Sequence, residues 1–533
     1  MSKGHVSRAE RARLPLARSV IEAVAVDNGV CVRPVPIRRV DVQTGESKLI
    51  DVPCGATLAA KCPSCAERAR RLRLSQCREG WHLTEEPIHA PDPATDEQRE
   101  LAALRADLEA AHAQATDARS DVTLIEAAIT EVDTALGEIG IRGSAKPGRS
   151  EGRRVRSTKR RQDTPDLPRR PVQPRTTGTA YGPEGRTVWP SLFVTLTLDS
   201  YGRVHSDGTP VDPDSYDYRR AARDAIHFPR LVDRFVQNLR RFVGWDVQYF
   251  ASVEPQRRLA PHLHLAMRGT VSRAELRQVA AATYHQVWWP ACEVPVYGDG
   301  CDPVWDADRD VYVDPESGEP LSTWDEALDS LDDDPDAEPV HVARLGRQVD
   351  AQGVLAGTPD AGRCLGYLAK YLTKSVSDCH APTTDAQITH VDRLWHTLRY
   401  EPCSERCSNW LRYGVQPRGA KAGMRAGYCR GKAHRREHLG YAGRRVLVSR
   451  KWSGKTLGDH RADRRAWVLE LLGKSAPQLD TSRYTWEPAG RDDPDMLPLA
   501  HRLLLAVAER SRWRAQLDAA RNAEAVAAAG AAA

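Results

Sequence analysis

The pattern of apolar and polar positions predicts a strand, a helix and a hairpin in the middle of the chain. Residues 192–198 form a β-branched and aromatic run typical of a buried strand. Residues 228–242 repeat apolar side chains at helical spacing, and Gly244 follows as a helix stop. Residues 247–253 then alternate like a strand and, after a turn, residues 262–267 return, which predicts a β-hairpin.

A second pattern, nearer the start of the chain, has a period of 3.5 residues. From residue 101, apolar positions follow in alternating steps of three and four over five heptads, which predicts a coiled-coil-like helix within residues 94–140. A homodimer through residues 101–136 and a helix packed on its own chain are both compatible with this pattern, since three alanines in the seam weaken a two-stranded coil.

Length and composition restrict the class of protein. A chain of 533 residues exceeds what one core usually organises, so we expect several domains. The 77 Lys and Arg against 72 Asp and Glu give a net charge of only +5, so nucleic-acid contacts must depend on local clusters. The sequence has no run of 18 apolar residues, so we expect no membrane span. Twelve cysteines without an apolar leader favour a cytoplasmic protein with reduced, partly metal-bound thiols.

Charge is distributed unevenly along the chain. Residues 141–188 are rich in Arg, Gly, Ser and Pro, which predicts a disordered basic linker that contacts DNA phosphates. Residues 298–345 are rich in Asp, and they lack the ligand spacing and central Gly of an EF-hand. We therefore expect an exposed, solvated acidic insertion there.

Two sets of cysteines have the paired spacing of structural zinc sites, so we expect two Zn²⁺ ions. The first set is Cys54, Cys62, Cys65 and Cys77, with His82 as an alternative to Cys77. The second set is Cys403, Cys407, Cys429 and His434. The alternative for each set is free buried thiols. Cys31 shows no such pairing.

The second set lies in a basic region that we expect to bind duplex DNA near a nick. Its candidate DNA-binding residues are Arg412, Arg418, Lys421, Arg425, Arg444, Arg445 and Lys451. Trp410 and Trp452 could offer stacking platforms for bases, although core packing is the simpler interpretation of each.

The candidate chemistry lies on the hairpin and on one later segment. On the returning strand His262 and His264 point to the same face, and Glu254 at the end of the outgoing strand can lie near them. A pair of histidines alone is weak evidence for a shared ligand, because two solvated histidines on one strand often arise by chance. Residues 366–374 read as the start of a helix with two tyrosines and two lysines on one face, although an ordinary amphipathic helix would also fit. These four residues are Tyr367, Lys370, Tyr371 and Lys374.

In this order the strand, the His-Leu-His motif and the tyrosine motif resemble the HUH endonuclease superfamily. Within it, the chain is most similar to RepSA-like rolling-circle replication initiators of actinobacterial integrative plasmids. The resemblance implies an α+β fold with an HUH-type central antiparallel sheet and flanking helices, plus zinc modules. It also implies that Glu254 completes a metal site with His262 and His264, and that both Tyr367 and Tyr371 are available.

The implied reaction is DNA nicking through a tyrosine. Imidazole and carboxylate ligands suit Mg²⁺ or Mn²⁺, and would also accept Zn²⁺, Co²⁺ or Ni²⁺. A free tyrosine has a pKa of about 10, so the metal, Lys370 or Lys374 must stabilise its phenolate. The products would be a 5′-phosphotyrosine and a 3′-hydroxyl for rolling-circle replication, with Tyr371 expected as the initial nucleophile.

The expected partners are single-stranded and duplex origin DNA, with a host helicase and polymerase, because the chain has no Walker A motif. The alternatives are a non-catalytic zinc-containing DNA-binding regulator, or a relaxase or transposase with the same chemistry. The predicted organisation is a zinc module at 1–93, the long helix at 94–140, the linker at 141–188, the endonuclease domain at 189–380, the zinc and DNA-binding region at 381–470, and a helical tail at 471–533.

Overall fold

The computed structural model describes residues 17–81, 83, 85–87, 94–139, 164, 166–178, 189–298, 300–355, 358–370, 372–373, 382–474, 483–490 and 493–531. The chain forms two compact units, one of Met1–Pro87 with Gln162–Ala533 and one of Ile88–Arg161. Helices and antiparallel sheets are mixed, as the sequence predicted. Among the described helices, none is long and apolar enough to cross a membrane.

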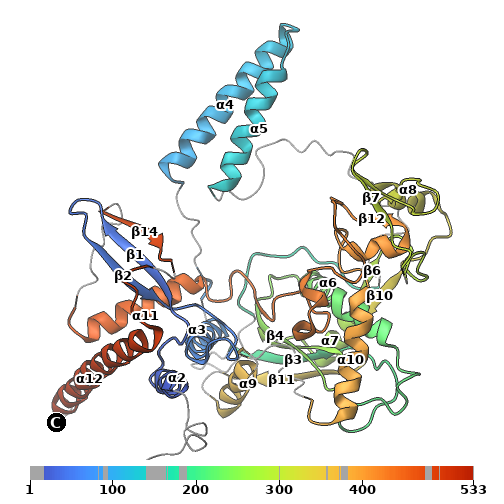
Figure 1. Cartoon of the computed structure of the whole chain (residues 1–533). Coiled ribbons are helices and arrows are strands. Elements are labelled where there is room, and N and C mark those ends of the chain that lie inside the picture. The colour runs from blue at the N-terminus through green and yellow to red at the C-terminus, as the bar shows by residue number, and fades with distance from the viewer. Residues whose placement is uncertain are drawn as a thin grey trace, which may run out of the picture. The chain divides into compact units, whose positions relative to one another are not determined.

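A five-stranded sheet forms the centre of the larger unit, with the strand order β11-β3-β5-β4-β13 and every pair antiparallel (Figure 1). The predicted strand and hairpin are confirmed as its three inner strands, and every residue of β5 is buried. The strands are β3 (Ser191–Thr197), β4 (Tyr249–Pro255), β5 (Pro261–Arg268), β11 (Val349–Val354) and β13 (Val446–Val448).

One face of this sheet packs against α6 (Tyr218–Val243), with α7 (Arg273–Ala282) and α10 (Asp385–Tyr400) completing the main core. Phe228 and Phe235 of α6 are fully buried there, because the helical repeat of apolar residues turns one side of the helix to the sheet. Gly244 ends α6 in the left-handed conformation at φ 76°, so the predicted helix stop is confirmed.

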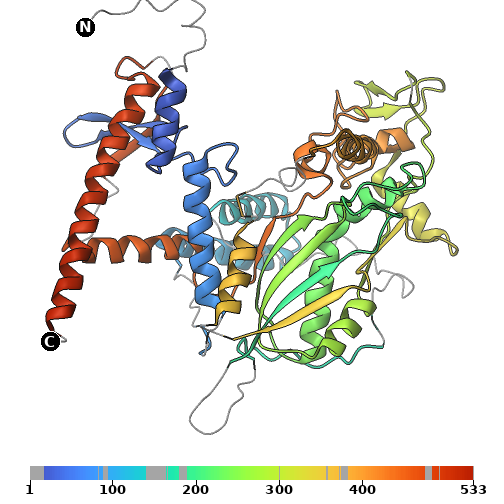
Figure 2. The same cartoon turned by 90° about the horizontal axis from the view of Figure 1, so that it is seen from below.

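The opposite face of the sheet is partly covered by α3 (Pro63–Trp81) and α9 (Pro359–Lys370), which lie side by side in Figure 2. Phe250 and Ala266 of this face contact a second apolar cluster that includes Trp81, Leu368 and Trp452. Trp452 is fully buried, and so is Trp410 elsewhere in the unit, so neither is a stacking platform for DNA. Core packing, the simpler interpretation, is correct for both.

The two ends of the chain share one module, which corrects the predicted separation of residues 1–93 from the tail at 471–533. In a three-stranded sheet β1 (Val35–Asp41) lies between β2 (Ser47–Val52) and β14 (Tyr484–Pro488), antiparallel to both. Leu503 packs with Ala25 and Val30 where α12 (Leu499–Ala531) contacts α2 (Ala17–Asp27). Near them lies α11 (Leu457–Leu471), which contacts both α3 and α12.

The smaller unit is a pair of helices, so the prediction of one continuous helix is wrong. The chain leaves α4 (Asp96–Asp117), turns at Arg119 with φ 53°, and enters α5 (Thr123–Glu138). Asp121 accepts hydrogen bonds from the backbone and hydroxyl of Thr123, which caps the new helix start. The contacts between α4 and α5 therefore bury part of the 3.5-residue seam, at Ile129, Val132 and Leu136.

An ion pair lies inside this helical hairpin. Arg105 is only 5% exposed, and its guanidinium lies 3.1 Å from Asp133 and 2.8 Å from Glu109. Because Asp133 belongs to the other helix, this contact joins α4 to α5 directly.

Part of the predicted disordered linker is ordered. Leu167 is buried in the main core, and Thr176 and Thr177 donate hydrogen bonds to the Glu86 carboxylate, with distances from 2.5 to 3.0 Å. These bonds hold the pKa of Glu86 at about 2 although burial raises it. Residues 141–163, 165 and 179–188 of the same segment lie outside the described residues.

The acidic insertion is folded, so the prediction of a solvated loop is also wrong. Its elements pack on the cysteine-rich region, where Tyr312 and Trp324 are buried and β9 pairs in parallel with β12 (Val415–Gln416). The 3-10 helix η3 (Ser408–Tyr413) supplies Trp410 to the same cluster. The insertion contains β7 (Val304–Asp306), β8 (Val311–Val313), β9 (Ser322–Thr323), α8 (Trp324–Asp333) and β10 (His341–Arg344), which pairs with β6 (Tyr284–Val287).

Candidate functional site

The central sheet brings Glu254, His262 and His264 together on the face that α9 partly covers. Strand register places Glu254 opposite His262, and His264 follows two residues later on the same face. The possible ligand atoms of all three residues lie within 4.8 Å of one another. Nε2 of His264 and Oε1 of Glu254 are hydrogen-bonded at 2.8 Å, and the two imidazole centroids are 4.2 Å apart.

The surroundings of these histidines suit metal ligands. The Thr195 hydroxyl is 3.1 Å from Nδ1 of His264, and the Phe193 ring stacks on the same imidazole with centroids 5.9 Å apart, so both orient the ring. Burial, together with the nearby His264 and Arg258, lowers the pKa of His262 to about 3. Nδ1 of His262 is buried without a hydrogen-bond partner in the described structure. A neutral imidazole with a free ring nitrogen is the form that coordinates a metal ion.

Tyr367 joins this cluster from α9. Its hydroxyl donates to Oε1 of Glu254 at 3.4 Å, and its ring centroid lies 4.6 Å from that of His264. Leu365 and Leu368 are buried on the other side of the helix, so packing holds α9 against the sheet, while Tyr367 keeps 39% of its surface exposed. A phenol that touches the carboxylate and one imidazole is within reach of anything the cluster binds.

The position of the tyrosine motif within its helix differs from the prediction. The motif was expected to start a helix, but α9 begins at Pro359 and ends at Lys370, so the motif lies at the helix end. Pro359 in the first turn, followed by Asp360, was the signal for the true start. Tyr371 and Lys374 lie outside the described residues, so their predicted roles stay predictions.

An open cleft continues from the cluster over the edge of the sheet. Phe193 and Thr195 line both the cluster and the cleft. Arg273 and Arg277 of α7 stand on its far side, and no ion pair of either is present in the described structure. The remaining lining residues are Val349, Asp350, Ala351 and Gln352 of the edge strand β11. A polyanion that reached the cluster along this cleft would meet positive charge.

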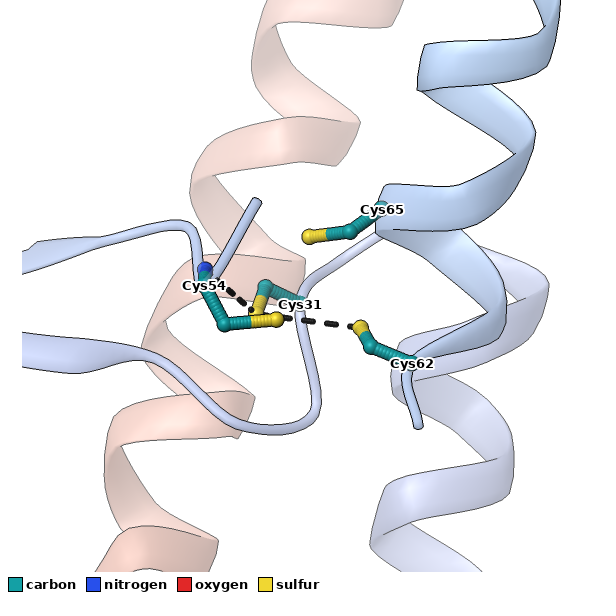
Figure 3. A group of neighbouring side chains, drawn as sticks. All are labelled: Cys31, Cys54, Cys62 and Cys65. Carbon is teal, nitrogen blue, oxygen red and sulfur yellow. Dashed lines mark hydrogen bonds between the residues drawn. The ribbon is translucent and has the colours of Figure 1, made fainter. Parts of the chain in front are cut away.

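The first cysteine cluster has a different membership from the one predicted. The Sγ atoms of Cys31, Cys54, Cys62 and Cys65 lie within 4.8 Å of one another (Figure 3). Cys31 is central, because its sulfur accepts a hydrogen bond from the Cys54 amide at 3.4 Å and lies 3.8 Å from the sulfur of Cys62. The β1–β2 hairpin lies between Cys31 and Cys54, so it returns the chain to Cys31, which spacing alone did not reveal.

Cys77 is not part of that cluster, and its prediction as a ligand is wrong. Its side chain is buried beside Trp81 and Trp452, where burial raises the pKa of the thiol. Cys77 lies on α3 well past Cys62 and Cys65, which are near the start of this helix, so the rigid helix carries it away from them. His82, the predicted alternative, lies outside the described residues.

The second cluster contains the predicted residues Cys403, Cys407, Cys429 and His434, again with ligand atoms within 4.8 Å. Nε2 of His434 is 3.4 Å from the Cys407 sulfur, and Nδ1 is 2.7 Å from the Leu398 carbonyl oxygen. That carbonyl can only accept, so Nδ1 carries the proton and Nε2 is left to coordinate. Both cysteine clusters could therefore hold metal ions such as zinc.

The predicted DNA-binding residues do not form one free patch. The acidic insertion folds over part of this region, so Arg418 pairs with Asp325 at 2.7 Å and Arg425 lies 3.8 Å from Asp302. Lys451 pairs with Asp246 at 3.2 Å, and Arg445 donates to the Val253 carbonyl. Lys421 and Arg444 are exposed to solvent, and Arg412 lies over the ring of Tyr400.

Fold and site together define an α+β protein with a Glu-His-His cluster on a central antiparallel sheet and two cysteine-rich clusters able to hold metal. The family model of the pSAM2 replication initiator protein, RepSA, matches residues 17–522. The chain therefore belongs to the RepSA family of plasmid replication initiators, which implies binding to DNA at an origin. Comparison with curated proteins and with solved structures gave no match.

Proposed function

We propose that this initiator is an HUH-type endonuclease that nicks one strand of origin DNA through a tyrosine and remains attached to the cut strand. The observation that carries the proposal is the contact of Tyr367 with both Glu254 and His264, on the face where His262 has an unused ring nitrogen. Family membership supplies the substrate, since replication initiators act on DNA.

Glu254, His262 and His264 would hold a divalent ion, with Mg²⁺ or Mn²⁺ as the proposed species. When bound there, such an ion would polarise the scissile phosphate and would offset the charge that builds up on its oxygens. The three residues fit this group, because their ligand atoms converge and His262 is neutral.

A tyrosine of the motif, Tyr367 or Tyr371, supplies the nucleophile. Its phenolic oxygen loses a proton and attacks the phosphorus, a Tyr O–P bond forms, and the P–O3′ bond breaks. The 3′ oxygen leaves with the electron pair and takes up a proton, which gives a 3′-hydroxyl that can prime synthesis. One phosphodiester replaces another, so the bond energy is retained for a later resealing step. Lys370 and Lys374 are proposed to stabilise the phenolate or hold the phosphate.

The other modules are proposed to bind and orient DNA. Two Zn²⁺ ions would fix the cysteine clusters, while exposed basic residues near the second cluster, such as Lys421 and Arg444, would contact duplex DNA beside the nick. A host helicase and polymerase would follow from the lack of a Walker A motif. A homodimer through residues 101–136 stays a proposal: the helical hairpin buries part of the apolar seam, while Leu104 of the same seam is 47% exposed.

Loss of the histidine cluster tests the proposal. Wild type and a His262→Ala, His264→Ala variant are incubated with labelled single-stranded plasmid DNA and Mn²⁺ or Mg²⁺, and covalent adducts are counted on a denaturing gel. We expect the variant to form no adduct while its DNA affinity stays nearly unchanged, because the metal provides Lewis acidity and the arginines provide affinity. His501→Ala, an exposed histidine on α12, is the matched control. Normal adduct formation by the double variant would refute the metal site, and no adduct from wild type would favour a non-catalytic regulator.

A further inference from the structure

A row of alternating arginine and tyrosine side chains lies beside the second cysteine cluster. The guanidinium carbon of Arg412 is 4.5 Å from the ring centroid of Tyr400, and Arg399 lies 5.4 Å from the same ring. Arg399 also lies 5.5 Å from the ring of Tyr428, which Arg425 approaches to 5.4 Å. These five residues are called the arginine–tyrosine ladder below.

The backbone beneath the ladder is fixed. Gly427 has φ +76°, and a Cβ there would come within 3.0 Å of the Tyr400 ring and 3.3 Å of Nε of Arg399. The Gly427 amide donates to the buried Asn409 side chain at 2.8 Å, and that side chain donates in turn to the Arg399 carbonyl at 2.9 Å. Because Cys429 directly follows Tyr428, the cysteine cluster also anchors the ladder. The side chains are therefore held in place before any ligand arrives.

The charges of the ladder are mostly uncompensated. Within the described part of the chain, no carboxylate lies within 4 Å of the guanidinium groups of Arg399 or Arg412, whereas the neighbouring Arg418 has two such partners. Arg425 has one carboxylate, Asp302, at 3.8 Å. Nε of Arg399 donates to the Gly427 carbonyl oxygen at 3.3 Å, which leaves the terminal N–H groups of this guanidinium for phosphate oxygens.

Tyr428 is the exposed ring of the ladder, with 64% of its surface accessible. An aromatic side chain that is held by a rigid backbone and left in solvent contributes little to the stability of the fold, because it removes little apolar surface from water. The same ring offers a stacking surface to a nucleobase. Bases of a duplex are already stacked and paired, so only an unpaired strand can use it.

We propose that the arginine–tyrosine ladder binds single-stranded DNA, with a base stacked on Tyr428 and the adjoining phosphates on Arg399, Arg412 and Arg425. The ladder lies on the cysteine-rich module and shares no residue with the Glu254, His262 and His264 cluster. The inference extends the proposed function and rests on it only for the identity of the ligand as DNA.

The test measures binding of the full-length protein to a fluorescent single-stranded oligonucleotide and to its duplex, by anisotropy and without added Mg²⁺ or Mn²⁺. We expect Tyr428→Ala to weaken single-strand binding by about tenfold, with duplex binding changed by less than about twofold. Tyr428→Phe keeps the stacking surface and should bind as wild type does. Trp486→Ala, which removes another exposed ring, should have no effect.

Arginine variants separate the ladder from general electrostatics. Arg399→Gln should weaken single-strand binding more than Arg406→Gln, because Arg406 is an exposed arginine of the same module that lies outside the ladder. Zinc content and circular dichroism of each variant show whether the module is intact. The proposal is overturned if Tyr428→Ala binds single strands as wild type does, or loses single-strand and duplex affinity equally. Adduct formation is scored in a separate assay, so failure of the ladder and failure of the nuclease proposal are distinguishable.

Discussion

Replacing Tyr367 by phenylalanine removes one oxygen and leaves the ring against His264. If the hydroxyl serves only as a donor to Glu254, its loss is small. A hydrogen bond to a charged acceptor contributes about 1.5–3 kcal/mol at normal length, and at 3.4 Å this long bond contributes about 1 kcal/mol or less. In that case the unfolding temperature falls by no more than about 4 °C and DNA affinity by no more than about fivefold. If the Tyr367 hydroxyl is instead the nucleophile of a strand-transfer step, the effect on the rate is much larger, because without the oxygen that step slows by more than about a thousandfold.

We expect the two tyrosines to divide the work. From the motif, Tyr371→Phe should lose the first covalent adduct, while Tyr367→Phe should form that adduct and fail in the second transfer that ends a replication round. The assay uses a labelled oligonucleotide with two nick sites, which reports the first adduct on a denaturing gel and the second transfer as release of a joined strand. Melting temperature and anisotropy of each variant serve as controls for folding and binding.

Three outcomes would refute this reasoning in different ways. If Tyr367→Phe loses the first adduct and Tyr371→Phe keeps it, the order is reversed, which the contacts of Tyr367 would explain. If each single variant forms the adduct and completes the second transfer, the tyrosines are interchangeable. If the double variant still forms a stable adduct, neither tyrosine is the nucleophile and the mechanism fails.

Two further predictions concern the modules around the site. Elemental analysis of the purified protein should find close to two zinc ions. Cys31→Ser should lose one of them and Cys77→Ser should keep both, because Cys31 lies in the sulfur cluster and Cys77 does not. Arg105→Ala should destabilise the helical hairpin by about 2–3 kcal/mol, because it removes the buried guanidinium that joins α4 to Asp133 of α5, and amide exchange within residues 96–138 should then speed up by roughly 30- to 150-fold.

Each of these predictions has a matched control. Loss of zinc from Cys77→Ser with retention in Cys31→Ser would restore the ligand set predicted from spacing. Arg99→Ala removes an exposed ion pair with Asp96 from the same hairpin and should change exchange little, since such pairs contribute below about 1 kcal/mol. Equal effects of the Arg105 and Arg99 variants would show that the buried pair does not hold the two helices together.

Local patterns were sufficient for the centre of the fold. A strand alternates its side chains with a period of two, so His262 and His264 could be placed on one face from the sequence alone. The hairpin then brought Glu254 opposite His262, because the turn between the strands is short. The second cysteine cluster formed as predicted from its paired spacing.

The errors arose where the determining contact is distant or where one signal masked another. Cys31 reaches its cluster only because a hairpin returns the chain to it. β1 pairs with β14, which lies more than 440 residues later in the sequence. Within the helical hairpin, the regular seam concealed the capping signal of Asp121. In the acidic insertion, the high charge drew attention away from Tyr312 and Trp324, whose burial requires a folded structure.

The pairing of β1 with β14 also sets an order for folding. Arg38 on β1 and Asp493 just beyond β14 are 455 residues apart, so at about 5–20 residues per second tens of seconds pass between synthesis of the two. During that time β1 has one unpaired edge, which is a template for association with other chains. A chain that stops before residue 484 keeps that edge permanently. We therefore expect truncated products to aggregate, which would favour full-length protein in the soluble pool.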